Sequence, residues 1–455
     1  MANNSEFKSK LGLLAATVGS AVGLGNVWRF PAEAQANGGA AFLLVYIVCV
    51  LCFGIPVMLG EFIIGRAGKG DAISSYKRLS PNQPWWVSGL FGVLCSYLIL
   101  TFYMVVSGWT LEYLYQSITG ELFEPIKGLT EGSNSQFMER MDEYVASVWP
   151  PIIWTWINII VCGLILSGGV QKGIEKASNI MMPMLFVILI ILCISAMTLP
   201  KASEGLQYFF NPDFSKITPQ VWINALGQAF FSLSLGMGTM ITYGSYFKKD
   251  TNLVNTSFTV SMCGILVAVL VGMIIFPGVL SFGLEGESFR GGTLVFVTFP
   301  EIFNRMWCPQ LWAILFFTLL TVAAITSSIS ISEVSIAYFC DHFKMKRIKA
   351  TALVMLPLFA LGALSSLSNG VLSDWTLFGY TIFSGCDAIT ANVIMPIGAL
   401  IMSIFLGWAA PKNLIRDQLT NNGQLKDYYV KPVTFLLKWV TPIVIVVILF
   451  TSMFL

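Results

Sequence analysis

The chain has 455 residues, of which 56% are hydrophobic and 11% are charged, and its formal net charge is +2. Soluble domains carry roughly 25% charged residues, and a water-soluble fold of this length cannot bury so much apolar surface, so the surrounding solvent must be lipid. The near-neutral charge excludes a general basic surface for nucleic acid, and the single histidine, His342, argues against a zinc enzyme or a Ser-His-Asp triad. We therefore predict an all-α integral membrane protein that is not an enzyme.

Eleven apolar runs are long enough to cross a bilayer as helices, since one crossing needs about 20 apolar residues. The runs lie at 11–35, 41–66, 88–116, 149–168, 178–200, 219–246, 254–283, 307–340, 349–368, 376–408 and 432–455. Most of the 26 Lys and Arg residues fall on alternate loops, starting with the N-terminal segment. Because cytoplasmic loops carry this excess, we expect a cytoplasmic N-terminus and, after an odd number of spans, an outside C-terminus.

Two of these spans contain residues that weaken a helix near mid-membrane. The first carries three glycines, an asparagine and an arginine within 19–29, and the sixth is rich in Ser and Gly at 231–239. One Gly-rich helix would be explained by close helix packing. Two matched breaks instead favour an inverted repeat with a binding site between its halves, at about 11–200 and 219–408. The last helix, 432–455, is then peripheral to a single transmembrane domain spanning 1–455.

The chemistry of such breaks suits an ion next to a carboxylate. Unwound carbonyls offer oxygen dipoles, and the N-terminus of a half-helix offers free N–H groups to an anion. The eighth span adds the hydroxyls of Thr326, Ser327 and Ser328. Hydroxyls in a helix commonly bond back to the preceding turn, but opposite a broken helix they are also candidate cation ligands.

With these motifs the chain resembles bacterial members of the neurotransmitter:sodium symporter family, over nearly its whole length. The resemblance is carried by the segments 19–31, 37–42, 54–66, 228–246 and 326–328. It implies two inverted five-helix repeats with broken helices 1 and 6. It also implies sodium-coupled symport of an α-amino acid into the cell, across the bacterial inner membrane, by alternating access. The amino acid and the lipid bilayer are the expected partners, and the oligomeric state stays open.

The resemblance implies a sodium site between helices 1 and 8, made of three carbonyls and two hydroxyls. Its residues are Gly19, Val22, Ala323, Thr326 and Ser327. Oxygen ligands of this kind suit a hard cation.

A second sodium site, next to the substrate carboxylate, is implied at Ala21, Asn26 and Ser232, with an Asn or Asp on helix 7. This chain has Gly264 at that helix-7 position, which brings no side-chain oxygen, and a water or a shifted Ser261 are the alternatives. The chloride-linked position, Ala268, also lacks a ligand atom, so we expect one sodium ion, an incomplete second site and no chloride.

The implied substrate site places the carboxylate between the Tyr103 hydroxyl and the amides of the first break, and the ammonium on carbonyls and a serine hydroxyl. Its residues are Ala21, Gly23, Gly25, Ile99, Tyr103, Phe231, Ser234, Met237, Ser327, Ser328 and Ile331. Gly23 leaves room for a carboxylate, and the flexible Met237 favours a larger apolar or aromatic amino acid. Ordinary helix packing remains the alternative for Ile99, Met237 and Ile331.

The resemblance also implies two gates. Arg29 would pair with Asp387 on the outer side, which is sensible because intramembrane charges are usually paired. Asp341 and Tyr246 would form the inner gate, but Asn4 stands at the position of its expected arginine, which leaves Lys8 or Lys10 as partners. Two alternatives stay open on this fold: coupling to protons through Glu61, Glu333 or Asp387, and a sodium-independent amino-acid sensor.

Overall fold

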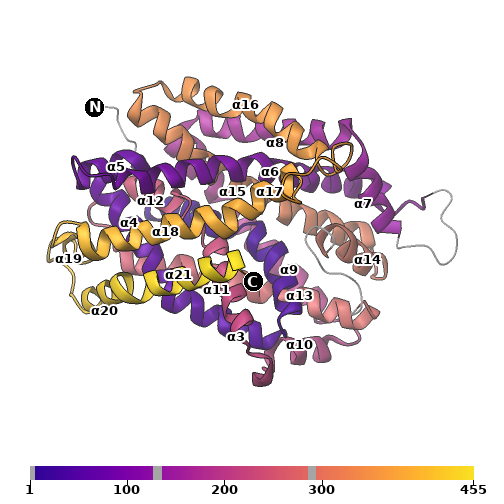
Figure 1. Cartoon of the computed structure of the whole chain (residues 1–455). Helices are drawn as coiled ribbons and strands as arrows, with labels where there is room; N and C mark the ends of the chain where they lie inside the picture. The colour runs from indigo at the N-terminus through magenta and orange to yellow at the C-terminus, as the bar shows by residue number, and fades with distance from the viewer. Residues whose placement is uncertain (1–5, 127–135, 285–293, 455) are drawn as a thin grey trace.

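The computed structural model describes residues 6–126, 136–284 and 294–454, and in these ranges the regular elements are all helical (Figure 1). Nine helices there are long and apolar enough to cross a membrane, or ten when the bent pair at the start of the chain is one span. The nine are Ala40–Gly68 (α3 Ala40–Cys49, η2 Val50–Gly54 and α4 Ile55–Gly68), Trp86–Thr119 (α6), Trp149–Ser167 (α8), Val170–Ala196 (η4 Val170–Glu175 and α9 Lys176–Ala196), Leu253–Phe282 (α13), Pro309–His342 (α15), Arg347–Leu367 (α16), Ile382–Ala409 (α17 Ile382–Ile389, η7 Thr390–Ile394, α18 Met395–Ile404 and η8 Phe405–Ala409) and Val430–Thr451 (α20 Val430–Phe435, η9 Leu436–Val440 and most of α21 Thr441–Phe454).

Two further spans are interrupted where the sequence predicts. Helix 1 consists of α1 (Lys10–Ala21), the π-helical turn η1 (Gly25–Arg29) and α2 (Phe30–Ala36), with a bend of 46° between its two parts. Helix 6 consists of α11 (Pro219–Ser232) and α12 (Thr239–Ser245), separated by residues 233–238. With helix 6 counted as one span, the prediction of about eleven membrane helices with broken helices 1 and 6 is confirmed. The residue limits of the two repeats stay a prediction.

Short helices between the spans were not predicted, because they are too short or too polar to show as apolar runs. They are α5 (Ala72–Leu79), α7 (Gln136–Ala146), α10 (Ala202–Phe210), α14 (Phe299–Asn304) with the preceding turn η6 (Leu294–Thr298), α19 (Leu414–Leu419), and the turns η3 (Glu121–Phe123) and η5 (Phe214–Lys216). Helix 5 also begins at Val170 rather than 178, since its first turn, η4, is polar, and helix 10 begins at Ile382 rather than 376.

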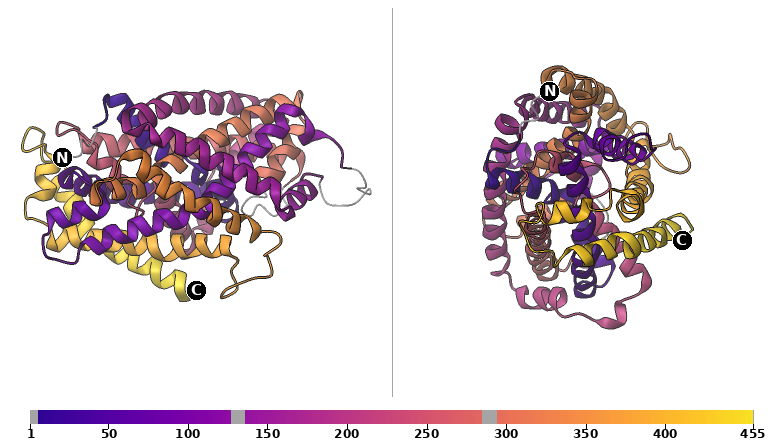
Figure 2. Two further views of the ribbon diagram at one scale, coloured as in Figure 1. Left: turned by 90° about the horizontal axis from the view of Figure 1, so that it is seen from above. Right: turned by 90° about the vertical axis from the view of Figure 1, so that its left-hand side faces the viewer.

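The bundle has a buried centre and a lipid-facing rim. Most of the long helices run in roughly the same direction, and Figure 2 shows the bundle along this direction in its right-hand view. In the most apolar stretch of α15, 83% of the residues are buried, and α15 packs along α6; in Val430–Thr451 the share is 28%. The last helix therefore has the least buried apolar stretch of the nine.

Three of the segments that carry basic residues meet at one end of the bundle. Lys69 Nζ contacts Glu6 Oε1 at 3.0 Å and donates to the carbonyl of Phe247 at 2.6 Å. Lys248 Nζ donates to the carbonyl of Lys8 at 3.3 Å. The N-terminal segment, the loop after helix 2 and the loop after helix 6 thus lie side by side, which agrees with the alternation of charge along the chain.

Candidate substrate and sodium site

The break in helix 1 exposes main-chain groups to the centre of the bundle. Val22 leaves the helical conformation at φ −109° and ψ 81°, and Gly23 follows it. A Cβ atom at position 23 would lie 2.2 Å from Ser327 Oγ and 3.3 Å from the Tyr103 hydroxyl. A side chain at this position would have to displace the Ser327 hydroxyl, because the Gly23 backbone lies close to both hydroxyl groups.

The break in helix 6 is built on left-handed backbone. Ser234, Gly236 and Gly238 have φ values of 54°, 79° and 77°, which glycine adopts readily and a serine rarely does. The buried carboxylate of Glu61, on α4, accepts a hydrogen bond from the Gly236 amide at 2.6 Å and so braces this turn. Ser234 Oγ donates to the carbonyl of Ser20 at 2.9 Å, which joins the two breaks.

A small cavity of about 20 Å³ lies between the two breaks. Its lining residues are Ser20, Gly23, Gly25, Ile99, Tyr103, Phe231, Ser232, Ser234, Met237, Ser327 and Ile331. The structure thus brings together all the predicted substrate residues except Ala21 and Ser328, which do not line it. Ser20 was missed: its side chain is buried next to the break, but the sequence motif draws attention to the glycines around it.

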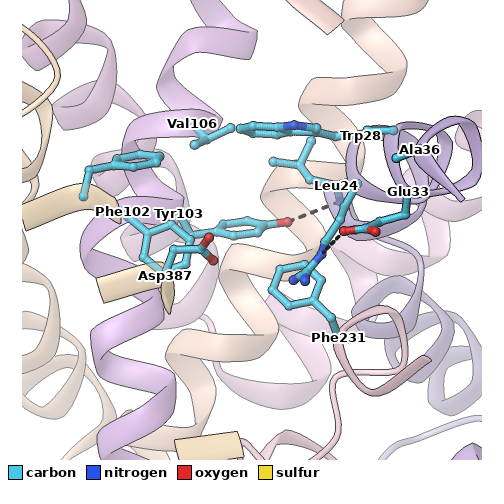
Figure 3. Close-up of a pocket in the computed structure, with 13 residues that line it drawn as sticks. Leu24, Trp28, Glu33, Ala36, Phe102, Tyr103, Val106, Phe231 and Asp387 are labelled. Atoms are coloured by element: carbon cyan, nitrogen blue, oxygen red, sulfur yellow. Dashed lines mark hydrogen bonds and ion pairs between the residues drawn. The ribbon is translucent and has the colours of Figure 1, made fainter. Parts of the chain in front are cut away.

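A larger cavity of about 440 Å³ lies above this one and contains the predicted outer gate (Figure 3). Gly25, Tyr103 and Phe231 line both cavities, so the two cavities adjoin at these residues. The Arg29 guanidinium lies 5.0 Å from the centre of the Phe231 ring, and its Nε lies 3.8 Å from Glu33 Oε1. Asp387 lines the same cavity, but among the described residues no ion pair within 4 Å joins it to Arg29. The outer gate residues face each other across an open space.

The predicted inner gate residues lie in a buried polar network at the opposite end. The Tyr246 hydroxyl donates to Glu333 Oε1 at 2.6 Å, and Arg347 holds both oxygens of the same carboxylate. Asp341 Oδ2 accepts from the amide of Asp71 at 2.8 Å. Burial raises the pKa of the Asp71 carboxyl, which itself caps α5. Glu333, which the sequence analysis names only as one of three candidate proton carriers, is therefore the anion of a buried ion pair with Arg347.

The N-terminal segment closes this inner end. Phe7 is buried and its amide donates to the carbonyl of Tyr246 at 3.3 Å. Glu175, on η4, accepts from the Lys8 amide at 2.8 Å and from the amide and hydroxyl of Ser9 at 3.1 and 2.8 Å. Within the described ranges no ion pair joins Lys8 or Lys10 to Asp341, and Asn4 lies outside the described residues. Sequence reasoning missed Glu175, because its partners are more than 160 residues away.

The residues of the predicted sodium site between helices 1 and 8 lie together and suit a cation. A Cβ atom on Gly19 would lie 3.4 Å from Thr326 Cβ, so α1 and α15 approach closely there. Thr326 Oγ1 donates to the carbonyls of Val322 and Ala323, each at 3.0 Å, and keeps its lone pairs for a further partner. Ser327 Oγ is buried with no hydrogen-bond partner among the described residues. Buried polar atoms usually have a partner, and a sodium ion would be one for the oxygen of Ser327.

A membrane-spanning bundle whose two interrupted helices meet at a small internal cavity is the architecture of a secondary transporter. Residues 4–126 and 138–455 match the sodium:neurotransmitter symporter family. The chain therefore belongs to this family of transporters, and neither the family nor the fold is that of an enzyme.

Relatives with closely similar sequences support this assignment. The chain is 35% identical over 444 residues to an uncharacterised sodium-dependent transporter of Bacillus subtilis, YhdH, covering 97% of this chain and 96% of the relative. It is 34% identical over 458 residues to a sodium-dependent transporter of Haemophilus influenzae, covering 98% of each. Among solved structures it is similar to MhsT in complex with L-phenylalanine, with a TM-score of 0.89, 40% identity and coverage of 99% of this chain and 100% of that one.

Proposed function

We propose that this protein carries an α-amino acid into the cell together with sodium. The observation that carries the proposal is the contact of Gly23 with the hydroxyls of Tyr103 and Ser327, which leaves main-chain amides and hydroxyls, and no acidic side chain, to meet the substrate. Amides at a helix break suit a carboxylate, as in an α-amino acid. Carbonyls at the same break suit its ammonium group.

An apolar or aromatic side chain fits the remaining walls of the cavity. Ile99, Phe231, Met237 and Ile331 surround the small space, and thioether and aromatic walls are adaptable to a bulky apolar group. The similar protein MhsT is described in complex with L-phenylalanine, which supports the same substrate class here.

Alternating access is the mechanism that we propose, across the bacterial inner membrane with the N-terminus in the cytoplasm. The 440 Å³ cavity above Phe231 and the packed N-terminal segment below describe a state that faces outward. A sodium ion held by helix 1 and helix 8 would favour this state. Substrate binding would then let the outer cavity close and the N-terminal segment leave. The two repeats, at about 11–200 and 219–408, would move against each other during this exchange.

Proton coupling is the second candidate, and one observation favours it. Glu61 Oε2 is buried without a hydrogen-bond partner among the described residues, so its carboxyl is a possible proton carrier. Glu333 is less suited, because Arg347 holds its carboxylate. A sodium-independent sensor on the same fold would differ by binding an amino acid without moving it.

The test is binding of a panel of amino acids to the purified protein in sodium and in potassium. We expect sodium-dependent binding of bulky apolar amino acids, abolished by Thr326→Ala with Ser327→Ala. Ser335→Ala is the matched control, since its hydroxyl is also buried on α15 without a hydrogen-bond partner among the described residues but is not one of the predicted ligands. Binding that is indifferent to sodium would refute sodium symport. Uptake that then follows a pH gradient would identify proton coupling, and binding without uptake a sensor.

A further inference from the structure

We propose that the loop between α16 and α17, residues 368–381, inserts an aromatic hairpin into the membrane interface and so anchors α17 to the lipid. Neither the transported ion nor the amino acid enters into it, because the partner is the bilayer itself. Four features of the loop support this role: its exposed side chains, its turn, its position on the bundle and its connection to α17.

The loop carries apolar side chains that the rest of the chain leaves uncovered. Phe378 is 93% exposed. Four more apolar or aromatic side chains are between 50% and 63% exposed: Val371, Trp375, Leu377 and Tyr380. A contiguous patch of this kind marks a surface that meets a partner or a membrane. Asp374 is the only charged residue in 368–381, so the patch suits an apolar medium rather than a charged partner.

The tip of the loop is a two-residue turn that presents the Phe378 ring. The Leu377 amide donates to the Tyr380 carbonyl at 2.8 Å, and the Tyr380 amide donates to the Leu377 carbonyl at 3.0 Å. Phe378 and Gly379 have φ values of 53° and 82°. Turns of this type favour Asn-Gly, and a bulky side chain seldom adopts the left-handed conformation. An aromatic residue thus occupies a strained position where its own chain scarcely covers it, which points to a partner outside the chain.

The loop lies where the lipid-facing helices begin. A Cβ atom on Gly370 would lie 2.7 Å from the Val145 carbonyl oxygen, so the loop starts against the end of α7, shortly before α8. The first residue of the spanning helix α8 is an exposed tryptophan, Trp149, and Trp and Tyr gather at membrane–water interfaces. Figure 2 shows the loop projecting from the side of the bundle in both views. That direction leads into the lipid that surrounds the bundle.

The base of the loop is fastened to α17, which contributes to the wall of the larger cavity. Ser368 Oγ accepts a hydrogen bond from the Phe383 amide at 3.0 Å, and Thr381 and Ser384 form a capping box at the start of the helix. The Phe383 ring lines the cavity and stacks on Trp109, with 5.9 Å between the ring centres. No residue of α17 is buried, so packing alone holds this helix weakly. A hairpin held in lipid would restrain it from the other side.

The direct test places a nitroxide label on Phe378→Cys in protein reconstituted into phosphatidylcholine nanodiscs. The two exposed cysteines, Cys52 and Cys308, are first replaced by serine, and this background protein alone gives the residual label to subtract. Collisions of the label with oxygen, which dissolves in lipid, are compared with collisions with a nickel chelate, which stays in water. Glu143→Cys, at an exposed position on the polar helix α7, is the matched control.

We expect the label at position 378 to collide more with oxygen and the label at position 143 to collide more with the nickel chelate. A label at 378 that favours the chelate would show that the hairpin lies in water and would overturn the proposal. A label at 378 that is shielded from both reagents would also overturn it, since a second copy of the chain or another protein would then cover the hairpin.

Phe378→Asn separates the turn from the anchor. Asparagine suits the left-handed turn better than phenylalanine, so the hairpin should keep its form and lose only the ring. In nanodiscs, hydrogen–deuterium exchange of the amides in 382–389 should become faster by about tenfold, because burying a Phe side chain is worth this factor or more. Thr376→Ser, exposed in the same loop, should leave the exchange unchanged. Exchange in Phe378→Asn that stays within about twofold of the unchanged protein would show that the tip does not restrain α17.

Discussion

Replacing Glu175 by alanine should loosen the inner closure of the transporter. This carboxylate sits on the first turn of helix 5, is 5% exposed, and holds the amides of Lys8 and Ser9 together with the Ser9 hydroxyl. These three hydrogen bonds fix the entry of α1, the half of helix 1 that would have to move away for the substrate to leave inward. Without them, the segment keeps its packing, the main-chain bond of Phe7, and the contacts of Glu6 and Lys8 with Lys69, Gln171 and Lys248.

The magnitude follows from the three bonds. A hydrogen bond to a charged group contributes about 1.5–3 kcal/mol, but the freed amides gain partners in water, so we take a net loss of about 2–4 kcal/mol. Since about 1.4 kcal/mol corresponds to a factor of ten, the opening equilibrium of the segment should increase about 30- to 1,000-fold. Ser9→Ala removes one of the three bonds and also the bond that its hydroxyl, as the N-cap of α1, accepts from the Gly12 amide. It should therefore produce a smaller change than Glu175→Ala, but not a negligible one.

Hydrogen–deuterium exchange in sodium measures this equilibrium, because amides exchange through local opening. The amides of residues 10–21 should exchange faster in Glu175→Ala by the factor given above, while amides in α16 keep their rates. Lys176→Ala, an exposed neighbour, is the matched control. Exchange in α1 within twofold of the unchanged protein would refute the reasoning, since it would mean that the other contacts of the segment hold it.

Three other variants test the site and its support. Gly23→Ala should reduce amino-acid affinity at least 100-fold in a binding assay, because the added carbon would lie 2.2 Å from a helix-8 hydroxyl, whereas Gly227→Ala, with nothing within 4 Å, should bind normally. Arg347→Met should lower the free energy of unfolding by about 3–5 kcal/mol, because it leaves the buried Glu333 carboxylate without its cation. Adding Glu333→Gln to this variant should restore part of the lost melting temperature. Met237→Phe should shift competition toward smaller apolar amino acids, since the cavity is only about 20 Å³; an unchanged preference would remove Met237 from the side-chain pocket.

The sequence was sufficient to predict the fold and the two breaks between which the candidate site lies, for reasons that are local. Apolar runs give the spans, and glycines at 19–25 and 236–238 weaken a helix whatever surrounds it. What could not be predicted depends on which groups packing brings together. Arg29 lies against Phe231 and Glu33 rather than in contact with Asp387, because the outer cavity between them is open.

The second sodium position shows the same division. The sequence shows that Gly264 has no side-chain oxygen, but it does not show that the side-chain amide of Asn26 donates to the carbonyl of Ala21. This hydrogen bond depends on the distance between two atoms in residues five positions apart, and the broken turn sets that distance. Likewise, Ser20 and Ser232 are the same residue type. The Ser20 hydroxyl has no hydrogen-bond partner among the described residues, whereas the Ser232 hydroxyl is bonded to Tyr46.

The hydrogen bonds at the centre of the molecule also indicate what a cation between helix 1 and helix 8 would do. Helix 1 is tied to helix 6 by Ser234 to the Ser20 carbonyl and by Gln228 to the Gly25 carbonyl, at 2.9 and 2.8 Å. These ties make the two broken helices one unit. Between helix 1 and helix 8, by contrast, the described residues show close packing at Gly19 and no hydrogen bond that ties them. A sodium ion shared by the two helices would supply the missing link, so its binding and release would decide whether the broken helices stay docked or move.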